Sequence, residues 1–292
     1  MPRHKPYSMK PELVRGCTMR CPFCSLKHME WAEQKYEFMD FGLFRQIVDE
    51  LSVWHPKHRF EIAARGEPTL YPQFMEAISY TRAKLPKAQI LVTTNTDIGE
   101  KMGWEKYREW IAEAQERGVN IFMLDAYSIR RLEILRETFR ESAQTFFGDK
   151  FNPYPYRHPK FKAIVVKDAT IGEQNVILRY HNQGGNAVVT EQQRKVWDIP
   201  ILTEPLSRMC VRPFREFPIH YDGTVPLCCD DWRQQQIIGT YPDKSLSELW
   251  NMYDPFRAAL LKKDRSHKPC NKCSERSGMR SGLEYNWFST EK

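Results

Sequence analysis

The chain has 292 residues, a formal net charge of +7 and 41% hydrophobic residues. That length suffices for one large α/β domain and a smaller appendage, with a sizeable buried core. The sequence contains no apolar run of the roughly eighteen residues that a membrane helix needs. Its opening segment, MPRHKPYSMKPEL, lacks the apolar stretch of a secretory signal. From these features we expect a cytoplasmic protein and not a membrane protein.

The charge is distributed unevenly along the chain. Most basic residues are interspersed with acidic ones, which is typical of a solvated surface. Two stretches, 2–20 and 262–280, are richer in Lys and Arg. They keep a nucleotide or nucleic-acid ligand open as an alternative, although it is not favoured.

The first two thirds of the chain alternate short apolar runs with amphipathic segments, a pattern typical of β-α units and a parallel sheet. Six strands are expected, at 11–16, 59–64, 89–94, 119–125, 161–167 and about 186–190. Apolar residues at helical spacing predict intervening helices around 44–51, 74–78, 107–114 and 129–139. Gly118 is expected to end the third helix. Residues 148–160 are expected to form a loop.

From about residue 207 the pattern changes to short extended pieces and turns. The segment SLSELW begins at Ser245 with Glu248 three residues later, which predicts a helix with a capping box. We therefore expect a boundary near 205, with a β/α domain at 1–205 and a small cysteine-bearing domain at 206–292.

Eight cysteines are present, and they are clustered at the two ends of the chain. Cytosolic thiols are kept reduced, so clustered cysteines favour metal binding or redox chemistry over disulfides. Three of them, Cys17, Cys21 and Cys24, have C-x3-C-x2-C spacing. Sulfur-rich sites select iron–sulfur clusters or zinc. Zinc would require a fourth ligand, for which His28 is available, whereas a cluster held by three thiolates leaves one iron open to bind a reactant.

The segment VRGCTMRCPFCSLKH resembles the CxxxCxφC motif of the radical SAM superfamily, with Phe23 as the aromatic residue. The resemblance implies that Cys17, Cys21 and Cys24 hold a 4Fe-4S cluster and that S-adenosylmethionine (SAM) binds the open iron. It also implies reductive cleavage of SAM to a 5′-deoxyadenosyl radical, with electrons from a reductant such as flavodoxin or ferredoxin.

Two further motifs support this resemblance. The sequence Arg65-Gly66-Glu67-Pro68 is similar to the family's GGEP segment, with Arg65 in place of the first glycine. The resemblance implies that Glu67 binds the SAM amine, through a charge-assisted hydrogen bond. Residues 93–96 (TTNT) are similar to a TTNG segment that ends the third strand in several relatives.

The fourth strand ends in Met123-Leu124-Asp125, where many relatives have Ser-Leu-Asp. Asp125 is equally well explained as the cap of the following helix. The implied fold is a partial (β/α)6 TIM-like barrel with its site at the carboxyl ends of the strands. The SAM contacts implied by the resemblance are Phe23, Gly66, Glu67, Asn95 and Asp125.

The second group of cysteines contains four suitable ligands: Cys210, Cys228, Cys270 and Cys273. On chemistry alone, four thiolates suit zinc and a fully ligated cluster equally well. The segment resembles the SPASM/twitch extension of radical SAM enzymes, including its G-x4-C element, which ends at Cys228. The resemblance implies a small α+β domain with one auxiliary 4Fe-4S cluster, in the shortened twitch form, and leaves Cys229 as the spare thiol.

The expected function is that of a radical SAM oxidoreductase or related modifying enzyme, which abstracts hydrogen from a substrate, favoured to be a small molecule. Twitch relatives include a dehydrogenase of amino-sugar alcohols. The auxiliary cluster would relay an electron or shape the pocket. Alternatives are a SPASM-type enzyme that modifies peptides or nucleotides, and a non-catalytic iron–sulfur or zinc protein. No catalytic residue is assigned. Candidate substrate contacts are Tyr127, His220, Asp230, Asp231 and Trp232.

Overall fold

The computed structural model describes residues 4–21, 24–62, 65–142, 145–147, 160–168, 183–187, 190–196 and 202–275. Its centre is a sheet of seven described strands in the order β7-β8-β6-β5-β4-β1-β9, and every pairing in it is parallel. The strands are β1 (Ser8–Pro11), β4 (Arg59–Ile62), β5 (Gln89–Thr94), β6 (Ile121–Ala126), β7 (Thr145–Phe147), β8 (Ala163–Asp168) and β9 (Glu216–Ile219).

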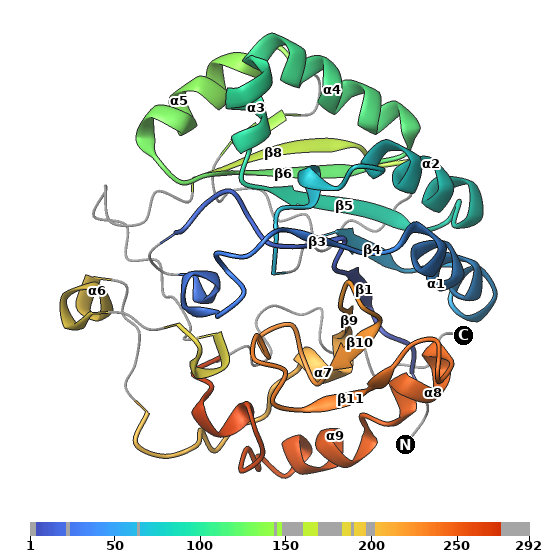
Figure 1. Cartoon of the computed structure of the whole chain (residues 1–292), viewed down its shortest axis with the longest axis vertical. Coiled ribbons are helices and arrows are strands. Elements are labelled where there is room, and N and C mark those ends of the chain that lie inside the picture. Colours follow the sequence, from blue (N-terminus) through green and yellow to red (C-terminus); the bar gives the residue numbers. More distant parts are fainter. Residues whose placement is uncertain are drawn as a thin grey trace.

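Helices line one face of the curved sheet, as Figure 1 shows for the blue-to-green part of the chain. They are α1 (Phe41–Trp54), α2 (Phe74–Lys84), α3 (Asp97–Met102), α4 (Trp104–Arg117) and α5 (Ile129–Thr138). Four of them cover the expected helical stretches, and Gly118 ends α4 with φ 139°. This is a mixed α/β architecture with a parallel sheet, as expected for a partial TIM-like barrel.

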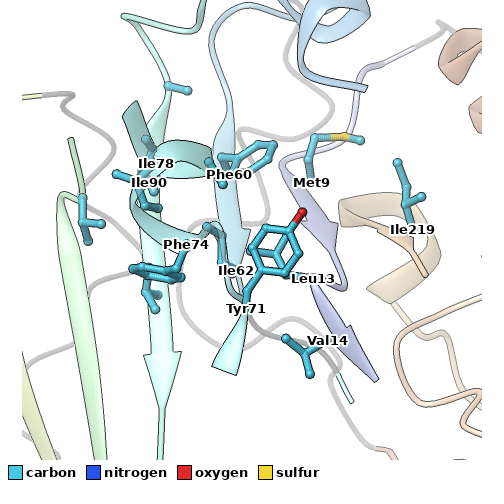
Figure 2. Packing of buried hydrophobic residues seen from close by; sticks show 14 of the residues in the cluster. Met9, Leu13, Val14, Phe60, Ile62, Tyr71, Phe74, Ile78, Ile90 and Ile219 are labelled. Carbon is cyan, nitrogen blue, oxygen red and sulfur yellow. The ribbon is translucent and has the colours of Figure 1, made fainter. Parts of the chain in front are cut away.

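The main core lies between the sheet and these helices. Figure 2 shows Met9 on β1, Phe60 and Ile62 on β4 and Ile90 on β5, with Phe74 of α2 beside them. All five side chains are at most 3% exposed. Burying apolar side chains of this size stabilises a fold by about 1.5–3 kcal/mol each. The helices are therefore held to the sheet mainly by packing.

The C-terminal part contains α7 (Arg212–Arg215), α8 (Leu246–Asn251), α9 (Asp254–Leu261) and the antiparallel hairpin of β10 (Thr224–Pro226) and β11 (Ile237–Thr240). The capping box of α8 is present, with Ser245 and Glu248 bonded reciprocally. Strand β9 pairs with β1 at the edge of the large sheet (Figure 1). The two parts of the chain therefore share one sheet, while the division at 205 stays a prediction.

The first expected strand, 11–16, was misplaced. The strand in the sheet is β1, and β2 (Val14–Arg15) instead pairs with β3 (Glu37–Phe38) in a separate two-stranded sheet. The inner face of β1 is polar, because Lys10 Nζ lies 3.5 Å from a carboxylate oxygen of Glu61 and 3.2 Å from one of Glu216. Strands β1 and β9 therefore lack the apolar run by which β4, β5, β6 and β8 were recognised, and the three-residue strand β7 was not predicted either.

The last expected strand, about 186–190, is also not formed in its described part. Residues Gln183–Gly185 form the short 3-10 helix η3, Asn186 is in a turn, and neither Ala187 nor Thr190 is in a strand. A short helix, α6 (Glu191–Val196), follows. The expected loop at 148–160 lies outside the described residues except for its last position. No helix in the described residues has both the length and the apolar character needed to cross a membrane.

Candidate active site

The three N-terminal cysteines lie in the loop between β2 and the 3-10 helix η1 (Ser25–His28). The Cys24 amide donates to the Cys21 carbonyl at 3.0 Å, and the Met19 amide donates to Cys17 Sγ at 3.4 Å. All three thiols line a cavity of about 260 Å³ at the carboxyl ends of the strands. His28 is not among the described residues that line this cavity.

Burial keeps these thiols from ionising unaided. Burial, together with nearby thiols and carboxyl groups, raises the pKa of Cys17 to about 11 and that of Cys21 to about 12. Burial likewise raises the pKa of Cys24. A thiolate here therefore requires a bound cation, and metal binding would release the protons. Among the described residues, no three His, Cys, Asp or Glu side chains converge on one metal ion; in a cubane, each thiolate binds a different iron.

The turn after β4 requires a glycine at position 66, because another part of the backbone passes very close to it. A Cβ atom at this position would lie 2.1 Å from the Val14 carbonyl oxygen and 2.6 Å from that of Gly16. The next amide, of Glu67, donates to the Gly16 carbonyl at 2.9 Å. Glycine at position 66 therefore lets the turn after β4 dock against the backbone that leads into Cys17.

The Glu67 carboxylate is 3% exposed and accepts four hydrogen bonds. Oε1 accepts from the Thr69 amide at 3.1 Å and from the hydroxyls of Thr69 and Thr94 at 2.7 Å each. Oε2 accepts from the Asn95 amide at 2.8 Å. Glu67 thus joins its own turn to the end of β5 and also lines the cavity. Burial raises its pKa, whereas these hydrogen bonds lower it; the net shift is upward.

Arg65, which departs from the family motif, has a structural explanation. It forms a buried bidentate pair with Glu12, with Nε and Nη2 donating at 2.8 and 2.7 Å. Its Nη1 donates to the Trp232 carbonyl at 3.1 Å. Burial raises the pKa of Glu12, but the charges of Arg65 and His220 and the hydrogen bonds from Arg65 and Tyr221 together outweigh it and leave that pKa lowered. Arg65 therefore ties the β4 turn to the C-terminal part of the chain.

Two predicted SAM contacts at the ends of β5 and β6 also line the cavity, Asn95 and Asp125. Asn95 Nδ2 donates to Cys17 Sγ at 3.2 Å. Asp125 Oδ2 accepts from the Tyr127 hydroxyl at 3.2 Å, whereas its buried Oδ1 has no hydrogen-bond partner among the described residues. The alternative that Asp125 caps the next helix is wrong, because Ser128 caps α5. Phe23, another predicted contact, lies outside the described residues.

The four C-terminal cysteines are brought together in a second buried site. Burial raises the pKa of Cys228 strongly, and Asp230 and the thiols of Cys270 and Cys273 raise it further. Burial and the Cys210 thiol raise the pKa of Cys270 and of Cys273 to about 12. Cys270 and Cys273 are therefore each close to both Cys210 and Cys228, as expected for four ligands of one cluster.

Cys229 faces a different environment from Cys228. Its Sγ accepts from Arg212 Nη1 at 2.8 Å, and its S–H donates to Glu216 Oε2 at 3.1 Å. Arg212 also pairs with Asp230 at 3.5 Å and with Glu275 at 2.7 Å. This arrangement supports Cys228 as the ligand and Cys229 as the spare thiol.

Trp232 links the two sites. It belongs to the C-terminal part, yet it lines the cavity with the N-terminal cysteines and packs against Leu26, Met29 and Ala32. Among the other candidate substrate contacts, Tyr127 also lines the cavity.

The remaining three candidates do not line it. His220 bonds Gln234, and the Asp231 carboxylate accepts from the amides of Gln235 and Gln236 at 2.8 Å each. Asp230 belongs to the Arg212 network described above. Gln183, which accepts from the Ser25 amide at 2.8 Å, also lines the cavity but was not recognised from sequence, because no motif marks it.

Family models match both parts of the chain. The model of the radical SAM superfamily matches residues 12–147, and that of the SPASM iron-sulfur cluster-binding domain matches residues 210–274. Together the matches span more than half of the sequence. The chain is therefore a radical SAM enzyme with a C-terminal SPASM domain, and its cofactors are a 4Fe-4S cluster, SAM and auxiliary iron–sulfur.

Solved structures agree with the fold. BtrN in complex with AdoMet and 2-DOIA superposes with a TM-score of 0.66 and 19% sequence identity, over 94% of this chain and 95% of that chain. The protein anSMEcpe with bound AdoMet gives a TM-score of 0.51 and 15% identity, over 88% of this chain and 81% of that chain. Identities this low show a shared fold only. No curated protein sequence gives a significant match.

The donor sets fit the implied cofactors. Three thiols on one loop, beside a cavity with further polar groups, suit a cluster with one open iron. The second site offers four buried thiols, enough to ligate a cluster fully. The matching model is the SPASM domain, and the shortened form with one auxiliary cluster stays a prediction.

Proposed function

We propose that this enzyme abstracts a hydrogen atom from a small-molecule substrate and oxidises or rearranges it. The observation that carries the proposal is the cavity, which combines the N-terminal cysteines with Glu67, Asn95 and Asp125 and is completed by Trp232. When bound, the cluster and SAM supply a 5′-deoxyadenosyl radical. The chain's own residues must then hold the reactants in place and exclude water.

We assign the SAM cluster to Cys17, Cys21 and Cys24. Glu67 and Gly66 would bind and position the amine end of SAM, since a carboxylate is the chemically matched partner of an ammonium group. Asp125 lines the cavity, and its buried Oδ1 has no hydrogen-bond partner among the described residues, so a small shift of this side chain would let it accept from a hydroxyl or ammonium group of a bound molecule.

We assign the auxiliary 4Fe-4S cluster to Cys210, Cys228, Cys270 and Cys273. With four protein ligands it has no open position for a substrate, so electron relay or shaping of the pocket is favoured over direct binding. The contact of Arg65 with the Trp232 carbonyl supports the second role, because it attaches the cavity wall to the loop that follows Cys228. A reductant such as flavodoxin or ferredoxin would supply the first electron, in a cytoplasmic setting.

Two solved structures bear on the class of substrate. The BtrN structure, solved with AdoMet and 2-DOIA, matches almost the whole of both chains. An anSMEcpe structure contains AdoMet and a peptide, with a TM-score of 0.50 and 14% identity. We therefore place a small molecule first and a peptide second, with a nucleotide or nucleic acid third because of the two basic stretches.

The test uses protein purified anaerobically and reduced in the presence of SAM. We expect brown protein that releases 5′-deoxyadenosine, and a rise in that release with the correct member of a substrate panel. Deuterium at the abstracted position should appear in 5′-deoxyadenosine. The matched control is Cys17→Ala/Cys21→Ala/Cys24→Ala, which should release none. Colourless protein with zinc in place of iron would contradict the proposal and favour a non-catalytic binding protein.

A further inference from the structure

Arg265 is a buried guanidinium whose described partners are all backbone carbonyls. It is 2% exposed and follows α9. Nε donates to the Arg208 carbonyl at 2.9 Å, and Nη2 donates to that of Met209 at 3.2 Å. Nη1 donates to the Glu275 carbonyl at 2.8 Å and lies 3.5 Å from that of Cys273. Arg265 therefore bridges the two segments that carry Cys210 and Cys273.

The guanidinium of Arg265 lies close to the backbone of two proposed ligands. Its Nη2 is 3.2 Å from the carbonyl of Met209, the residue before Cys210, and its Nη1 is 3.5 Å from the carbonyl of Cys273 itself. An arginine in a protein remains charged at any ordinary pH. The positive charge is therefore permanent and lies beside the proposed ligands.

A second buried arginine provides the comparison. Arg212 pairs with three carboxylates, those of Glu216, Asp230 and Glu275. No carboxylate among the described residues forms an ion pair with Arg265. An unpaired buried charge costs several kcal/mol, and carbonyl dipoles offset only part of that cost. Four thiolates around an iron–sulfur cluster would supply a negative charge beside Arg265.

We propose that Arg265 is the counter-ion of the auxiliary cluster, holding its two ligand segments together and favouring the cluster's more negative, one-electron-reduced state. The proposal rests on the cluster assignment made above. Cluster potentials depend on net charge and on surrounding hydrogen bonds. Reduction adds one electron from an external reductant without breaking a ligand bond, so a fixed positive charge nearby raises the reduction potential. Arg265 is thus a positioning residue that would make the cluster a better electron acceptor.

The test measures the reduction potential of the auxiliary cluster in full-length Cys17→Ala/Cys21→Ala/Cys24→Ala protein, where the first cluster cannot assemble. A redox titration monitored by electron paramagnetic resonance is suitable. We expect Arg265→Met to lower the equilibrium constant for one-electron reduction of the cluster by about tenfold or more. A tenfold change corresponds to a decrease of about 59 mV in the reduction potential. Arg208→Met is the matched control, because the Arg208 side chain is exposed and solvent screens its charge. Its potential should match that of the parent.

Each outcome decides the question. Equal potentials for Arg265→Met and the parent would overturn the proposal. If Arg265→Met assembles no cluster, Arg265→Lys decides, because it retains the charge and loses the fork of donors. Assembly of Arg265→Lys with an unchanged potential would support the proposal, and its failure to assemble would overturn the charge role. Parent protein without iron would instead refute the assignment of the auxiliary cluster on which the proposal rests, while the proposed function has its own test in 5′-deoxyadenosine release.

Discussion

At the scale of single residues, Glu67 joins two elements and is also a candidate ligand of SAM. Its carboxylate already accepts from Thr69, Thr94 and Asn95, and a buried carboxylate with such partners is held in one orientation. A fixed negative charge beside the cavity suits an ammonium group better than a mobile one would, because less conformational entropy is lost on binding.

We expect Glu67→Gln to weaken SAM binding by roughly tenfold to a hundredfold, the equivalent of losing a charge-assisted hydrogen bond of about 1.5–3 kcal/mol. Iron content should be unchanged, and SAM affinity can be measured by calorimetry under anaerobic conditions. The control is Thr69→Val, which removes one donor to the same carboxylate but leaves its charge. If both variants bind SAM equally well, the charge of Glu67 has no role in binding.

At the scale of elements, the site depends on the close approach of the β4 turn to the segment after β2. Gly66 permits this approach, and the Glu67 amide bonds the Gly16 carbonyl across it. The cysteine loop begins immediately afterwards, at Cys17. The position of the cluster-binding loop is therefore set by contact between two turns rather than by the loop alone.

We expect Gly66→Ala to lower the free energy of unfolding by roughly 1–3 kcal/mol, the usual cost of overpacking, because the backbone at Val14 and Gly16 cannot yield cheaply. SAM cleavage should fall with it, as measured by 5′-deoxyadenosine release. Gly42→Ala near the start of α1 is the control, since its new Cβ would meet only the Asp40 side chain. Wild-type stability and cleavage in Gly66→Ala would show that the turns can separate without consequence.

At the scale of the whole molecule, two cysteine sites in different parts of the chain share one sheet through β1 and β9. The iron content of cysteine variants can distinguish the two sites. Two clusters correspond to about eight irons per chain. We expect about half to remain in Cys17→Ala/Cys21→Ala/Cys24→Ala and about half in Cys270→Ala/Cys273→Ala. Cys229→Ala should retain the full complement, and loss of half the iron in that variant would exchange the roles of Cys228 and Cys229.

Stability should also depend on pH through His58, which is buried at the end of the sheet away from the cavity. Burial lowers the pKa of His58 to about 3 from 6.5. Below about pH 6.5 the unfolded chain binds a proton at this histidine that the folded chain does not. The free energy of unfolding therefore decreases as the pH is lowered. We expect about 2 kcal/mol to be lost between pH 7 and pH 5. Anaerobic denaturant titrations of His58→Gln should show a flatter pH dependence, and an unchanged slope would contradict this cause.

Local patterns in the sequence predicted much of the fold and of the site. Helices α1, α2, α4 and α5 follow from apolar spacing, which reports directly on the buried face. Strands β1 and β9 were missed because their inner faces carry Lys10 and Glu216, which pair with each other. Such pairing is invisible in either segment alone.

The sequence by itself determined the chemistry of the protein, because the spacing of Cys17, Cys21 and Cys24 and the Gly66-Glu67 motif are local features that define a donor set. Only the tertiary structure decided which distant residues complete each site. It placed Trp232 in the wall of the cavity with the N-terminal cysteines, and it placed Arg265 beside the second group of thiols with no carboxylate partner among the described residues. The physical reason is that such contacts depend on burial and strand register over the whole chain, which no local pattern encodes.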